Sequence, residues 1–311
     1  MAFLKRGKHA NYSILNSFSW HVPDAVDSFV MLLWLVAGLF VSILVAYAVL
    51  MAAPSLGLEY QQLIIYPIMF IPPFLVSSLV SKRNMYFENG YKVDNTISKS
   101  ITPWLACLLC ILGTWAMGFI MDKVNSFLPE VPDSWKTALQ SLVGGNFLIC
   151  FICVSILAPV LEEWLLRGIL LRGLLNCKRS NGKVGYSPAA SIIATSAIFG
   201  IIHLNPWQAI PAFSMGCLFG YVYYKTGSLK LTILMHFANN TLSLVIGQFA
   251  GIDESADSWE QIMPASMYYA ILAACLAIVI LVVLRFRKIQ STPNGNFELI
   301  PAEVPEASPL P

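Results

Sequence analysis

The chain has 311 residues, of which 57% are hydrophobic and only 12% are charged, and its mean hydropathy is +0.68. An ordinary soluble domain is much less apolar and carries about twice that share of charge, so this class is excluded. The net charge is only +2, and no cluster of Lys and Arg is interleaved with aromatic residues. The sequence therefore indicates a lipid bilayer as the main partner and no nucleic acid.

The apolar residues of the chain are gathered into eight runs. A membrane-spanning helix needs about 20 mostly apolar residues, and the runs at 29–51 and 265–284 meet that length without a single charge. The other six lie at 63–80, 101–121, 147–175, 189–202, 209–224 and 231–250. Three prolines should kink the second run, and Asn205 and Pro206 separate the short fifth and sixth runs. The sequence predicts an all-α fold, a polytopic transmembrane helical bundle of about eight spans.

Positive charge is distributed unevenly between the loops that join these runs. Lys and Arg accumulate in short cytoplasmic loops, and with a cytoplasmic N-terminus the opposite side of the membrane holds only Lys123 and Lys136. We therefore expect a multi-pass membrane protein with both termini in the cytoplasm. The membrane we expect is a bacterial inner or plasma membrane. The expected parts are a cytoplasmic segment at 1–28, the bundle at 29–288, and a proline-rich, disordered tail at 289–311.

Three charged residues lie well inside the fourth apolar run: Glu162, Glu163 and Arg167. A charged side chain within a bilayer costs about 2.5–3.5 kcal/mol on insertion scales, so such residues usually pair or serve a function. Glu163 and Arg167 are four residues apart and share a helix face, whereas Glu162 lies about 100° around the helix. One acid is therefore paired and the other free, although all three could also form a purely structural network.

Two of the four histidines, His203 and His236, fall at or within the ends of later apolar runs. A single membrane histidine can be a packing residue, but two beside an unpaired carboxylate favour catalysis. His236 and Asn240 are four residues apart on one face and can both donate hydrogen bonds to an oxyanion. By the same spacing Phe199 shares a face with His203. From the predicted boundaries, however, the two histidines lie near opposite ends of their helices.

This set of side chains suits the attack of water on a carbonyl group. A carboxylate, here Glu162, accepts the proton of the water while hydrogen-bond donors stabilise the tetrahedral oxyanion. The sequence contains no G-x-S-x-G serine motif and no H-E-x-x-H zinc motif.

The pattern resembles the CPBP family, the CAAX proteases and bacteriocin-processing enzymes also called Abi proteins. Its three motifs are E-E-x-x-x-R, F-x-x-x-H and H-x-x-x-N, and here they begin at Glu162, Phe199 and His236. The resemblance covers residues 147–250 and implies an intramembrane endopeptidase with an intramembrane cavity. It implies that Glu162 and His203 activate water, that His236 and Asn240 form the oxyanion hole, and that Glu163, Arg167 and Phe199 support them.

Two alternatives remain open from the sequence. The first is a zinc-dependent version of the same protease, with Glu162, His203 and His236 as ligands, although we expect no cofactor because Asn240 is a poor zinc ligand. The second is a non-catalytic transport or bacteriocin-immunity protein. The expected substrate is a peptide or lipidated protein within or at the membrane, and nothing in the sequence identifies it.

Overall fold

The computed structural model describes residues 21–83, 101–177, 179, 181–249 and 258–289, and all regular elements within these ranges are helices. The first half of the chain forms α1 (Ala25–Ala52), α2 (Leu58–Arg83), α3 (Pro103–Asn125) and α4 (Asp133–Val143). A long central helix, 147–176, follows, and then come α8 (Pro188–Ile201), α9 (Pro206–Thr226), α10 (Leu229–Phe249), α11 (Trp259–Ile262) and α12 (Ala265–Arg287). The structure is therefore the all-helical polytopic bundle that the sequence predicts.

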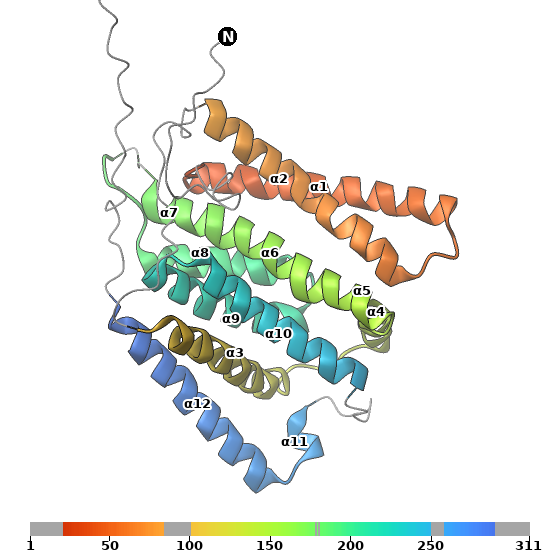
Figure 1. Ribbon diagram of the computed structural model, residues 1–311, viewed down its shortest axis with the longest axis vertical. Coiled ribbons are helices and arrows are strands. Elements are labelled where there is room, and N and C mark those ends of the chain that lie inside the picture. Colours follow the sequence, from red (N-terminus) through yellow and green to blue (C-terminus); the bar gives the residue numbers. More distant parts are fainter. Residues whose placement is uncertain (1–20, 84–100, 178, 180, 250–257, 290–311) are drawn as a thin grey trace, which may run out of the picture.

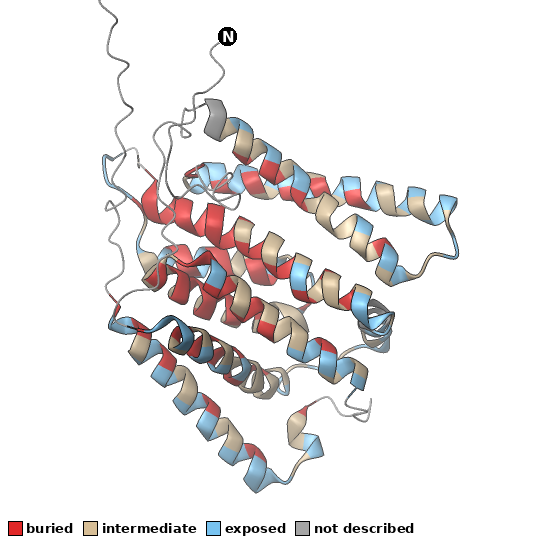
Figure 2. Ribbon diagram, in the orientation of Figure 1, coloured by how far each residue is buried: buried red, intermediate tan, exposed pale blue. Residues whose placement is uncertain are grey.

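The helices are arranged around the central helix. The α1–α2 hairpin lies along one side of it, and α8, α9 and α10 lie along the other, with α3 and α12 beyond them (Figure 1). Buried residues gather on the central helix and on the facing parts of α9 and α10, while α1 and α12 expose much of their length (Figure 2). The outer faces of the bundle are thus the ones that a lipid bilayer would cover. Glu162, Glu163 and Arg167 of the fourth run are buried inside the bundle.

The central helix is not a regular α-helix along its whole length. Short α-helical stretches, Phe147–Cys150 (α5), Ala158–Glu163 (α6) and Arg172–Asn176 (α7), alternate with π-helical stretches, Phe151–Leu157 and Trp164–Leu171. Pro159 lies in α6 and has no backbone N–H to donate. π-Helical turns are wider than α-turns and occur frequently at functional sites, and here they flank the stretch that ends in the two glutamates.

Each of the eight predicted runs corresponds to a helix, but their membrane-spanning capacity differs. In the described ranges six helices are long and apolar enough to cross a membrane, and α8 and α9 are not among them. With 14 residues, α8 is only about 21 Å long at 1.5 Å per residue. The first span begins at Ala25 and not at Phe29, and the predicted positions of both termini fall on residues outside the described ranges.

The segment before α1 is fastened to the end of the central helix by a buried arginine. Arg172 donates to the backbone carbonyl of His21 at 2.5 Å and to that of Gly168 at 2.8 Å. The imidazole of His21 is buried, and neither of its ring nitrogens has a hydrogen-bond partner among the described residues. Burial lowers the pKa of His21 to about 4, the Arg172 guanidinium adds to this effect, and the Asp24 carboxylate opposes it.

The lowered pKa of His21 makes the folded state sensitive to acid. The imidazole of His21 binds a proton near pH 6.5 in the unfolded chain but only near pH 4 in the folded chain. Its contribution to the free energy of unfolding is therefore fully present above pH 6.5 and is lost as the pH falls toward 4. The expected loss is up to about 3 kcal/mol. We expect unfolding in detergent to show this loss for the wild type and a smaller one for His21→Leu; equal pH slopes for both proteins would contradict the assignment.

The crossing of α1 and α2 depends on one glycine. A Cβ atom at Gly38 would lie 2.1 Å from the backbone carbonyl oxygen of Met69 in α2, so Gly38→Ala must push the two helices apart. We expect a loss of about 1–3 kcal/mol in the free energy of unfolding. Gly118→Ala in α3 is the matched control, because its Cβ would meet the Met215 methyl at 3.5 Å and Asn239 Oδ1 at 4.0 Å, both ordinary van der Waals distances, and it should not destabilise the protein.

Candidate active site

A buried ion pair lies at the centre of the candidate site. Arg167 Nη1 donates to Glu163 Oε1 at 2.7 Å, and both side chains are 0% exposed. Arg167 Nη2 also donates to the carbonyl oxygen of Gly216 in α9 at 3.2 Å, and the guanidinium lies over the ring of Phe199, 5.1 Å from its centroid. The pair that the four-residue spacing predicts is therefore formed, and it joins the central helix to α8 and α9.

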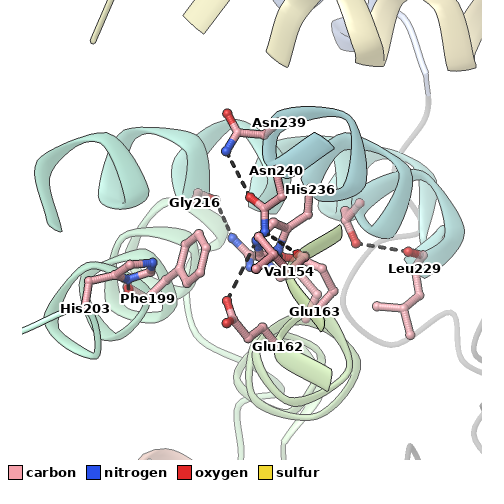
Figure 3. Close-up of polar contacts among 12 residues, drawn as sticks. Val154, Glu162, Glu163, Phe199, His203, Gly216, Leu229, His236, Asn239 and Asn240 are labelled. Atoms are coloured by element: carbon pink, nitrogen blue, oxygen red, sulfur yellow. Dashed lines mark hydrogen bonds and ion pairs between the residues drawn. The ribbon is translucent and has the colours of Figure 1, made fainter. Parts of the chain in front are cut away.

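The same carboxylate oxygen of Glu163 also holds a histidine of α10. His236 Nδ1 lies 3.1 Å from Glu163 Oε1, and because a carboxylate can only accept, Nδ1 carries the hydrogen. The other ring nitrogen, Nε2, then faces Glu162, whose Oε2 lies 3.9 Å away. Figure 3 shows the two glutamates of the central helix directed toward His236. The imidazole is thus oriented by one carboxylate and presented to the other.

Glu162 has two carboxylate oxygens in different surroundings. Oε1 accepts a hydrogen bond from the hydroxyl of Tyr66 in α2. Oε2 is buried and has no hydrogen-bond partner within the described part of the chain; its 3.9 Å distance to His236 Nε2 is too long for a direct hydrogen bond. The glutamate is 9% exposed, so this oxygen is an available proton acceptor in a largely water-poor place.

His203 lies in the turn that follows α8, and Phe199 separates it from His236. The ring of Phe199 lies 5.2 Å from that of His203 and 5.4 Å from that of His236, centroid to centroid. Figure 3 shows Phe199 between the two histidines. His203 Nδ1 lies 2.8 Å from the carbonyl oxygen of Phe199, so Nδ1 carries the hydrogen and Nε2 keeps its lone pair. His203 follows the C-terminal end of α8 and His236 lies in the second turn of α10, as the predicted boundaries place them. Because α8 is short, His203 nevertheless stays beside the site.

The backbone beside His203 is strained and held by an asparagine. Leu204 has a φ of 58°, the left-handed region that non-glycine residues rarely adopt. The buried amide of Asn205 donates to the His203 carbonyl at 2.9 Å, and its oxygen accepts from the backbone N–H of Gln208 at the start of α9. The asparagine thus caps α9 and fixes the turn that carries His203.

Asn240 lies one turn after His236 in α10, and its amide is already oriented. Nδ2 donates to the carbonyl oxygen of Val154 at 2.9 Å, and Oδ1 accepts from the neighbouring Asn239 at 3.1 Å. An amide nitrogen has two hydrogens, so the Asn240 amide can make one further donation. Asn239 lies about 100° around α10 from Asn240, and its amide contacts that of Asn240.

Direct contacts join five of the seven predicted site residues, Glu162, Glu163, Arg167, Phe199 and His236, and His203 joins them through Phe199. Asn240 lies one helical turn after His236, and its amide contacts Val154 and Asn239. The residue that the sequence did not indicate is Tyr66, which lies in α2, far from the three motifs. Its signal in the sequence is weak, because one tyrosine next to a proline in an apolar helix is ordinarily a packing residue.

The donor set does not fit a metal ion. Within the described residues no group of three or more His, Cys, Asp or Glu side chains is arranged to hold one. Of the three ligands considered from the sequence, only Glu162 and His236 approach each other, and the oxygen of Glu163 nearest to them is already shared by Arg167 and His236. We therefore derive no step that involves zinc.

Comparison with known proteins gives three matches. The family described as type II CAAX prenyl endopeptidase Rce1-like matches residues 144–242. The chain is 25% identical over 190 residues to the membrane-embedded CAAX protease MroQ of Staphylococcus aureus (strain USA300). This alignment covers 59% of this chain and 74% of that protein. It is 28% identical over 120 residues to the uncharacterized protein YyaK of Bacillus subtilis (strain 168), covering 35% and 37% of the two chains. No solved structure matches.

The ion pair predicts a strong asymmetry between single and double substitutions. Arg167→Met leaves the Glu163 carboxylate buried without its cation, and we expect the free energy of unfolding to fall by about 3–5 kcal/mol. Combining it with Glu163→Gln removes the uncompensated charge and should recover part of that loss. Unfolding in detergent measures both; a double variant that is less stable than Arg167→Met would contradict the pairing.

Proposed function

Because the chain belongs to the CPBP family of CAAX proteases, we propose that it is an intramembrane endopeptidase in which Glu162 activates the attacking water. The protein is a multi-pass integral protein of a bacterial membrane. The observation that carries the proposal is the buried Glu162 Oε2, which lies 3.9 Å from His236 Nε2 and has no hydrogen-bond partner among the described residues.

In the proposed reaction Glu162 Oε2 takes one proton from water, and the resulting hydroxide attacks the carbonyl carbon of the scissile bond. The carbonyl oxygen becomes an oxyanion, which donors in a water-poor site stabilise. The tetrahedral intermediate then collapses, the C–N bond breaks, and the leaving amine takes the proton back from Glu162. No group outside the chain and the water is required for this balance.

His236 and Asn240 supply the donors of the proposal. Glu163 holds the imidazole through Nδ1, which leaves Nε2 to carry a proton toward the reacting group when the ring is charged. The Asn240 amide uses one hydrogen on Val154 and has the second for the oxyanion. Both side chains come from one face of α10, so their relative positions are set by a single helix.

His203 is a second proton acceptor in this proposal. Its Nδ1 hydrogen is used on the Phe199 carbonyl, which leaves the Nε2 lone pair for a proton of the water or of the substrate. Phe199 packs against both histidines and excludes bulk water from the space between them. Its family role as a supporting residue is consistent with this position.

We propose a peptide or lipidated protein at the membrane as the substrate. The matched family is described as a CAAX prenyl endopeptidase and the staphylococcal relative as a CAAX protease. A substrate with a lipid-modified or apolar end would partition into the bilayer and reach a site that lies among spanning helices. The chain's own residues then have to supply only the hydrolytic step.

Glu162→Gln tests the mechanism, because the amide keeps the shape of the side chain but cannot take the proton. We expect cleavage of a fluorogenic peptide library by detergent-purified protein to fall by at least about 100-fold. Glu130→Gln, the same change at an exposed position, should leave the rate unchanged. Each protein is assayed with and without a strong zinc chelator.

Three results would contradict the proposal. Full activity of Glu162→Gln would rule out Glu162 as the group that activates water. Loss of wild-type cleavage in the presence of the chelator would show that the reaction depends on a metal ion. No cleavage by well-folded wild type would favour the transport or immunity class.

A further inference from the structure

Tyr66 reaches the site from a part of the chain that the family match does not cover. It lies in α2, whereas the match spans residues 144–242. Its hydroxyl donates to Glu162 Oε1, a contact between residues 96 positions apart. The one oxygen of Glu162 that has a partner in the described structure is therefore held by a helix outside the three motifs.

A chain of aromatic contacts fixes the position of this hydroxyl. The Tyr66 ring lies 5.4 Å from that of Phe70, Phe70 lies 6.1 Å from Phe74, and Phe74 lies 5.2 Å from Trp164, all between centroids. Trp164 directly follows Glu163 in the central helix. The contacts thus run down α2 and return to the central helix beside the glutamates, so α2 cannot slide along that helix without breaking them.

The hydrogen bond distinguishes the two oxygens of the carboxylate. A free glutamate side chain has several rotamers and exchanges its two oxygens readily. With Oε1 held by Tyr66, the remaining oxygen, Oε2, is left on the side of His236, 3.9 Å from Nε2. The result is one oriented acceptor in place of two interchangeable ones.

We propose that Tyr66 is a positioning residue that holds Oε1 of Glu162 and thereby directs Oε2 toward the attacking water. This inference rests on the proposed function, since it assigns to Tyr66 a role in the proton transfer to Glu162. Catalytic groups must be held close to their productive geometry, and a misplacement of about 1 Å can lower the rate by about 100-fold.

Tyr66→Phe removes the hydroxyl and keeps the ring with its aromatic contacts. We expect kcat to fall by about 10- to 100-fold while KM changes by less than about twofold, because substrate binding does not involve the hydroxyl. Tyr60→Phe is the matched control: Tyr60 lies in the same helix, is 39% exposed, and should retain the wild-type kcat and KM.

A double-mutant cycle with Glu162→Asp separates positioning from packing. The aspartate keeps a carboxylate, but its shorter side chain no longer reaches the Tyr66 hydroxyl. If Tyr66 acts through Glu162, adding Tyr66→Phe to Glu162→Asp lowers kcat by less than about twofold. A residue with only a packing role would lower it by the same factor in both backgrounds.

The outcomes distinguish this inference from the proposed function. If Glu162→Gln abolishes cleavage and Tyr66→Phe behaves like Tyr60→Phe, only the role of Tyr66 is overturned. An equal kcat loss in both arms of the cycle, or a Tyr66→Phe protein that does not fold, assigns the hydroxyl to packing and also overturns it. If Glu162→Gln still cleaves, the proposed function fails first.

Discussion

The buried ion pair between Glu163 and Arg167 is the interaction on which the rest of the site depends. Two charges in an apolar span are costly unless each is paired and hydrogen-bonded, and here one glutamate oxygen accepts from both Arg167 and His236. The arginine also reaches the Gly216 carbonyl. The pair therefore balances its own charges, joins the central helix to α9 and sets the tautomer of His236. Its geometry thus orients the imidazole that faces Glu162 Oε2.

The lengths and irregularities of the helices around this pair bring the side chains of the candidate site together. α8 ends after 14 residues, so its last turn and His203 stay beside the site, while the wider π-helical turns of the central helix flank the glutamates. Phe199 fills the space between the two imidazoles. On the opposite side α2 closes the site with the Tyr66 hydroxyl. A short helix, the irregular central helix and the proline-containing α2 thus enclose the Glu162 carboxylate.

Much of the fold could be predicted because the signal is local. Each apolar run became a helix, since backbone groups in lipid have to bond within their own segment. The short helices α4 and α11 were missed because they lie in polar loops without an apolar run. The burial of Arg172 against the segment before α1 was not predicted, because a partner that it has there is a backbone carbonyl, which leaves no trace in the sequence.

The sequence by itself determined the class of protein, the helices and the partners that lie one turn apart. Glu163 with Arg167 and Phe199 with His203 follow from a spacing of four residues, which is a property of any helix. Only the tertiary structure decided that Glu162 faces His236 and Tyr66, that Phe199 stands between the histidines, and that the Asn240 amide rests on Val154. These contacts join different helices, and their distances depend on where helices end, widen and cross, which periodicity does not specify.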